Sequence, residues 1–156
     1  MLRLALLAAL LCILSAVLCV PAPGSTQETI EALRARADSA APADCSRICI
    51  EAARRLIQEI GKHYSDGNTE LARKTTEDAI HYAELGTLAS VQTHRHLKDN
   101  EISIRKFAHR LAEIERNLSY DDRGPVDVQI VKLEKLRDLL LDAMFGTPKK
   151  SLEGKR

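Results

Sequence analysis

Aromatic residues are scarce in this chain of 156 residues, at 3% of the sequence, and tryptophan is absent. The rings present are Tyr64, Tyr82, Phe107, Tyr120 and Phe145. Proteins that hold single-stranded nucleic acid stack its bases on exposed rings, so this scarcity argues against such a partner. The formal net charge of +1 also provides no strong basic field for a phosphate backbone. We therefore expect no nucleic-acid partner.

Motifs that carry chemistry are also missing. The sequence contains no Gly-rich phosphate loop, no nucleophile elbow and no His-Glu-x-x-His pattern. Di-iron helical bundles need paired Glu-x-x-His motifs, and none occurs around the histidines of this chain. These absences predict a protein that is not an enzyme and carries no cofactor.

The N-terminal segment has the order of a secretory signal peptide. Arg3 provides a short basic start, and an apolar run from Leu4 to Val20 follows. Ala22 and Gly24 are the small residues that precede the preferred cleavage site. We predict a signal peptide over residues 1–24 and an extracytoplasmic location, periplasmic or secreted. Retention of this segment as a membrane anchor is the alternative, because the run is near the length that spans a bilayer.

Residues 25–44 are rich in Pro, Ala and Ser and are predicted as a linker. Ser25 and Glu28 have the spacing of a capping box, and Ile30, Leu33 and Ala37 give one apolar stripe behind it. The segment is therefore predicted to be either a short helix or a disordered spacer.

The remainder of the chain predicts an all-α fold, an antiparallel bundle over residues 45–146. In each segment apolar side chains recur every three or four residues, which is the period of an amphipathic helix. The predicted helices span roughly 45–65, 69–96, 100–119 and 125–145. Short connections between them favour antiparallel neighbours. Residues 147–156 are predicted to form a disordered basic tail.

Local signals set the expected helix ends. Asp44 or Ser46 is the expected cap of the first helix, and Gly67 supports the turn after it. Asn100 is the expected cap of the third helix. Pro125 is expected in the first turn of the fourth helix, where a missing backbone N–H is tolerated.

Residues 53–86 resemble a single tetratricopeptide repeat. Gly67 occupies the turn position, and Ala72 and Ala79 fall on the two alanine positions of the second helix. Thr76 stands where the family has a bulky residue. The resemblance implies a helical hairpin that binds protein, and a plain hairpin in a bundle explains the same small residues. The rest of the chain resembles small exported all-helical bacterial proteins.

Cys45 and Cys49 are four residues apart, so both lie on one face of the first predicted helix. Three interpretations stay open. An exported protein favours a disulfide, although a bridge between consecutive helical turns fixes little tertiary structure. One thiol can instead lie in the core, or the two can hold a soft metal ion such as Cu(I).

These observations predict a non-enzymatic interaction or structural module. Its expected partner is another protein or a second copy of the chain, with a membrane involved only if residues 1–24 are retained. The candidate binding residues are Tyr64, Tyr82, Phe107 and Leu140. The alternative function is a periplasmic metal-binding or redox module that uses Cys45 and Cys49.

Overall fold

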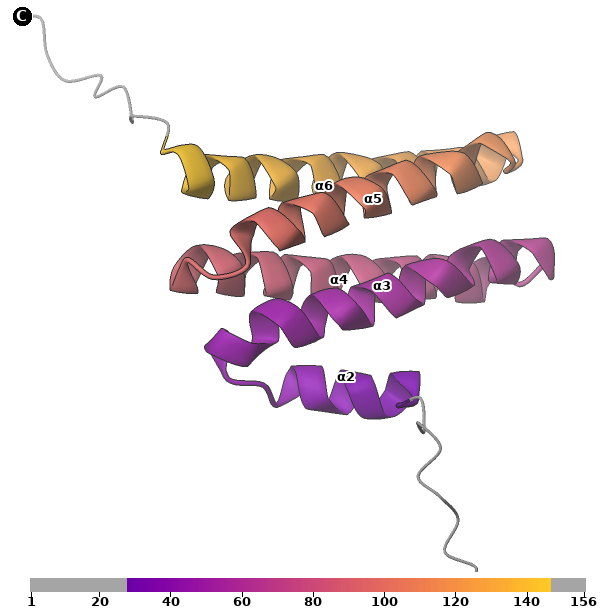
Figure 1. Cartoon of the computed structure of the whole chain (residues 1–156). Coiled ribbons are helices and arrows are strands. Elements are labelled where there is room, and N and C mark those ends of the chain that lie inside the picture. The colour runs from indigo at the N-terminus through magenta and orange to yellow at the C-terminus, as the bar shows by residue number, and fades with distance from the viewer. Residues whose placement is uncertain (1–27, 147–156) are drawn as a thin grey trace, which may run out of the picture.

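The computed structural model describes residues 28–146, and every regular element within that range is an α-helix (Figure 1). The helices are α2 (Ile30–Asp38), α3 (Pro42–Ser65), α4 (Thr69–Thr93), α5 (Leu97–Arg116) and α6 (Tyr120–Phe145). The prediction of an all-α fold is confirmed, with five helices in the described range rather than four. The predicted signal peptide or anchor, and the predicted tail, lie outside the described residues.

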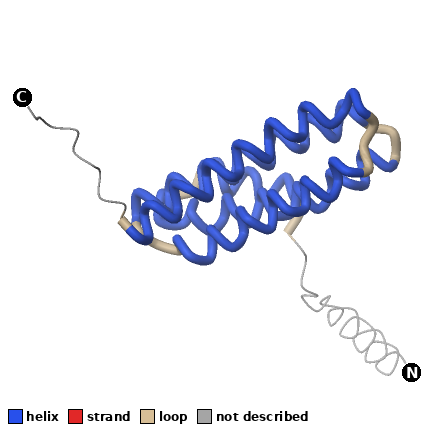
Figure 2. Tube along the Cα trace, turned by 90° about the horizontal axis from the view of Figure 1, so that it is seen from above, coloured by secondary structure: helices blue, strands red, loops and turns tan. Residues whose placement is uncertain are grey.

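Two antiparallel hairpins form the body of the molecule. Helices α3 and α4 make one hairpin, and α5 and α6 make the other. Figure 1 shows the second hairpin lying over the first, with α2 beneath α3. In this stack α6 lies along α4, and α5 lies along α3 in the same chain direction. Figure 2 shows the elongated shape that the long helices give when seen from above.

Helix α2 occupies part of the segment predicted as a linker, and it packs against α3. The Thr29 Oγ1 atom accepts a hydrogen bond from the Ala32 N–H at 3.2 Å, which caps the helix start in place of the predicted Ser25. Leu33 and Ala37 are only 1% and 3% exposed, so the predicted apolar stripe is buried. Of the two predicted alternatives for this segment, residues 30–38 therefore adopt the short helix.

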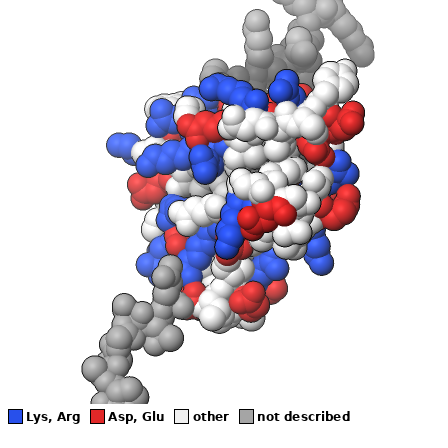
Figure 3. Space-filling model, turned by 90° about the vertical axis from the view of Figure 1, so that its right-hand side faces the viewer, with Lys and Arg blue, Asp and Glu red and all other residues white. Residues whose placement is uncertain are grey.

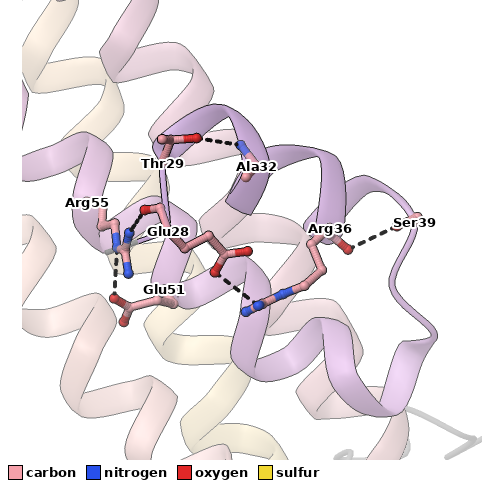
Figure 4. Close-up of polar contacts among 7 residues, drawn as sticks. All are labelled: Glu28, Thr29, Ala32, Arg36, Ser39, Glu51 and Arg55. Atoms are coloured by element: carbon pink, nitrogen blue, oxygen red, sulfur yellow. Dashed lines mark hydrogen bonds and ion pairs between the residues drawn. The ribbon is translucent and has the colours of Figure 1, made fainter. Parts of the chain in front are cut away.

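Polar contacts tie the start of α2 to α3 (Figure 4). Glu28 forms an ion pair with Arg36 at 3.0 Å, and Arg55 of α3 donates a hydrogen bond to the Glu28 carbonyl oxygen. Arg55 also contacts Glu51 one turn away at 3.3 Å. These side chains are partly exposed, so burial of the apolar stripe is the stronger contribution to holding α2 in place.

Some helix boundaries differ from the prediction because a proline starts a helix earlier or a residue with positive φ ends one earlier. Helix α3 begins at Pro42, after Ala41, because proline suits the first helical position. Helix α4 ends at Thr93 because His94 adopts a φ of 52°. Pro125 was predicted in the first turn of the last helix. Helix α6 instead begins at Tyr120, so Pro125 lies inside it.

The predicted cap Asn100 instead lies within α5 and is buried. Its Nδ2 atom donates to the Ser46 carbonyl oxygen at 2.8 Å and to Ser90 Oγ at 2.6 Å. Ser90 Oγ donates in turn to the Gly86 carbonyl oxygen at 2.9 Å. One buried amide thus joins α3, α4 and α5, which satisfies polar groups that would be costly to bury alone.

No helix in the range 28–146 combines the length and the apolar character needed to cross a membrane.

Candidate functional site

Two of the predicted binding residues are core residues, and this corrects the prediction. Tyr82 is 6% exposed and Leu140 is fully buried. The Tyr82 hydroxyl donates to Asp38 Oδ1 at 3.0 Å, which fixes the ring between α2 and α4. Burial, together with this hydrogen bond, raises the pKa of Tyr82 to about 12. Phe107 is as deeply buried, at 4% exposed, but unlike Phe107 neither Tyr82 nor Leu140 lines one of the hollows described below.

The other two predicted residues, Phe107 and Tyr64, line a groove between α3 and α5. The central hollow of this groove has a volume of about 400 Å³. Ile57 of α3 and Phe107 of α5 are each more than 95% buried, and their remaining surface forms the apolar floor. Tyr64 lines a second hollow of about 310 Å³ towards the C-terminal ends of the same helices.

The groove continues in both directions from its central hollow. Arg110 belongs to the walls of both the central and the second hollow. Arg54 and Ser103 are shared with a third hollow of about 350 Å³, which extends towards Arg47 and Asn100. The three hollows therefore follow one another along the line where α3 meets α5, with the Arg54–Ser103 hydrogen bond crossing between the central and the third. We call this row of hollows the α3–α5 groove.

Cationic side chains form the walls of the central hollow. Arg54, Lys106 and Arg110 line it, and no carboxylate does. Arg54 forms an ion pair with Glu51 and donates to Ser103 Oγ at 3.2 Å. Within residues 28–146, no ion pair is formed by Lys106. Lys106 is therefore the cation of these walls that has no carboxylate partner in the described part of the chain.

Arg110 is already paired within its own helix. Its Nη1 atom lies 3.0 Å from Glu113 Oε2, and this contact lowers the pKa of the Glu113 carboxyl. Both side chains are about half exposed, so water screens the two charges and the ion pair contributes little free energy. Arg110 can exchange this partner for another carboxylate at small cost.

Sequence patterns alone did not find Arg54, Lys106 and Arg110. Each lies on the polar side of its own amphipathic helix, where charged residues are expected in any soluble protein. These three side chains line the same hollow only because α5 packs on α3, and the two helices are far apart in the sequence. The sequence analysis reached this region only through Phe107 and Tyr64, which it named as candidate binding residues.

A second groove, between α4 and α6, is similar in size but different in charge. Its volume is about 390 Å³, and Ile80 and Leu136 are its apolar lining residues. The charged residues around it are of both signs: Glu77, Glu84, Lys132 and Lys135. Carboxylates and ammonium groups therefore balance along its walls.

Buried polar atoms surround a small hollow of about 40 Å³ where α3, α4 and α6 meet. Tyr64 Oη, Arg73 Nε and Gln129 Oε1 are buried, and none has a hydrogen-bond partner within the described part of the chain. The pKa of Tyr64 is raised, mainly by burial and then by the nearby Asp122 carboxylate. The hollow has the room and the polar partners that one ordered water requires.

Cys45 and Cys49 are both free thiols in the structure. Cys49 is fully buried, and its sulfur lies 4.0 Å from the Ala37 carbonyl oxygen of α2. Burial, and then the neighbouring Cys45 thiol, raises the pKa of Cys49 well above its ordinary range. The disulfide between these residues stays a prediction. Among residues 28–146, no cluster of three or more His, Cys, Asp or Glu side chains is arranged to hold a metal ion.

Exposed apolar side chains lie mainly on α6, away from both grooves. They include Val128, Val131, Leu139 and Phe145. Lys135, Asp138 and Asp142 alternate with them along the exposed side of the helix. This interrupted pattern lacks the continuous apolar seam that pairs helices in coiled coils.

No protein-family model, curated protein or solved structure matches this chain.

Proposed function

We propose that this protein is a non-enzymatic binding module that holds a helix of a partner protein in the α3–α5 groove. The observation that carries the proposal is the row of three hollows along the line between α3 and α5, the central one with Ile57 and Phe107 at its floor. Amphipathic helices bind in such grooves by inserting apolar side chains, with polar contacts at the rim. Phe107 and Ile57 would contact those apolar side chains.

The dimensions of the groove support a helix as the bound element. Its walls extend on α3 from Arg47 to Ser65, a rise of about 27 Å at 1.5 Å per residue. A partner helix of about 18 residues has the same length. The groove is open to solvent along its side, which suits an elongated chain segment better than a compact small molecule.

Site-specific photocrosslinking in cells that naturally make the protein tests this function. A photoreactive amino acid at Gln58, on the groove wall, is expected to form an adduct with a separate polypeptide. The same amino acid at Lys74, an exposed position on α4, is the matched control. Adducts of equal yield at the two positions, or none at Gln58, would refute the proposal.

The cysteine pair separates this function from the alternative metal or redox module. A variant with Cys45→Ser and Cys49→Ser is expected to keep the Gln58 adduct, because neither thiol lines the groove. Loss of the adduct in a variant that still folds would favour the alternative.

A further inference from the structure

We infer that the α3–α5 groove selects a partner helix whose polar face is acidic. This inference rests on the proposed function and adds the chemistry of the partner. Its basis is the set of charges on the groove walls, and the contrast with the second groove of the same molecule.

The cations of the groove are placed to meet carboxylates on both sides of a bound helix. Arg54 projects from α3, and Lys106 and Arg110 project from α5, so positive groups border the apolar floor on each side. Arg47 adds a further cation where the groove continues along α3. Glu or Asp residues that flank the apolar face of a helix would lie beside these groups.

Carboxylates near the groove offset part of its positive charge. Glu51 and Asp99 line the third hollow, and Glu113 lines the second. Among the described residues, the charged groups that line the central hollow are Arg54, Lys106 and Arg110. Arg54 pairs with Glu51 and Arg110 with Glu113, whereas Lys106 forms no ion pair within residues 28–146. The end view in Figure 3 also shows Lys and Arg gathered towards one flank of the molecule.

The α4–α6 groove shows that size alone does not define the site. It matches the central hollow in volume and has apolar lining residues, but Glu77 and Glu84 oppose Lys132 and Lys135. An acidic helix gains attraction in the α3–α5 groove and meets both attraction and repulsion in the other. Charge complementarity of this kind mainly provides specificity and faster association.

Three synthetic peptides of about 18 residues test the inference. All three have the same Leu and Ala face, and their polar faces consist of Glu, Gln or Lys. Affinity for the purified protein is measured by fluorescence anisotropy at about 0.05 M and about 0.5 M salt. We expect the Glu peptide to bind about tenfold more tightly than the Gln peptide at low salt, and most of this advantage to disappear at high salt.

Charge reversal provides the matched control. Lys106→Glu is expected to weaken binding of the Glu peptide by about three- to tenfold and to improve binding of the Lys peptide. Lys132→Glu makes the same change in the α4–α6 groove and is expected to alter neither affinity by more than about twofold. Both residues are exposed, so circular dichroism should show unchanged folding.

The outcomes separate the inference from the function on which it rests. If the Gln and Lys peptides bind as tightly as the Glu peptide, the groove accepts helices but the acidic preference is wrong. If no peptide binds, the proposed function fails and the inference fails with it. Displacement of the Glu peptide when the protein dimerises would identify a second copy as the occupant and overturn the inference. Preferential binding to anionic lipid vesicles would overturn it as well.

Discussion

Helices α3 and α4 approach each other closely at Gly86, and replacing this residue with alanine tests the packing of the hairpin. A Cβ atom at Gly86 would lie 2.7 Å from Ile50 Cγ1 and 3.0 Å from Ile50 Cδ1. Carbon atoms pack without strain at about 3.5–4.0 Å. The Ile50 backbone nitrogen would lie at 3.2 Å, so a new side-chain rotamer at Ile50 cannot relieve the whole overlap.

Two opposing terms set the magnitude of the effect of Gly86→Ala. Alanine favours the helical state over glycine by about 1 kcal/mol, which stabilises α4. Overpacking a buried site costs about 1–3 kcal/mol, and Ile50 is buried. We expect a net loss of up to about 2 kcal/mol, or a decrease in Tm of up to about 8 °C.

Gly61→Ala is the matched control, since Gly61 also lies inside a helix. Its Cβ atom would meet Arg110 and Ile114 side chains at 3.7 Å, which is ordinary contact. The propensity term then acts alone, and the variant should be more stable by about 0.5–1 kcal/mol. Thermal and urea unfolding measure both values. A Gly86→Ala protein as stable as Gly61→Ala would refute the close approach of α3 and α4.

Three further predictions concern buried polar and thiol groups. Asn100→Leu should cost about 1–3 kcal/mol in urea unfolding, because two buried hydrogen bonds are lost, and a cost below about 0.5 kcal/mol would contradict the proposed role of the amide. The raised pKa of Tyr82 means that its stabilising effect is complete below the unfolded value near 10 and is lost as pH rises towards 12. Unfolding measured against pH should show a larger loss in the wild type than in Tyr82→Phe, where the raised pKa values of Tyr64 and Cys49 still contribute. In the Cys45→Ser variant, the remaining Cys49 thiol should react with iodoacetamide far more slowly than Cys45 does in Cys49→Ser, because Cys49 is buried and has a raised pKa. Equal rates would contradict the packing of α2 over Cys49.

The helices were predictable because each buries one apolar stripe of regular period. Ile104 and Leu111, for example, are fully buried, and Phe107 between them keeps only 4% of its surface exposed. Helix starts were less predictable, since they depend on competition between neighbouring signals. Asn100 has the chemistry of a cap, but α5 begins at Leu97, so the amide joins the buried network instead.

The candidate site was only partly predictable, because the same periodicity marks core residues and apolar binding residues. Tyr82 and Leu140 were chosen as candidates from this pattern, and both are buried. Phe107 is as buried as Tyr82, but Phe107 and Tyr64 line hollows along the line where α3 meets α5. That line depends on the stacking of two hairpins, which local sequence patterns do not encode.

The stacked hairpins also bear on the resemblance to a repeat unit. In a repeat protein each hairpin buries an equivalent face against the next, so equivalent positions need similar residues. Here α4 packs small side chains inward, among them Ala79, Ala83 and Gly86, whereas α6 uses Leu133, Leu136 and Leu140. Small residues let helices approach closely, and leucines hold them further apart. The two hairpins thus have the same helix arrangement but bury side chains of different size. This difference favours one helical bundle over units of a repeat array.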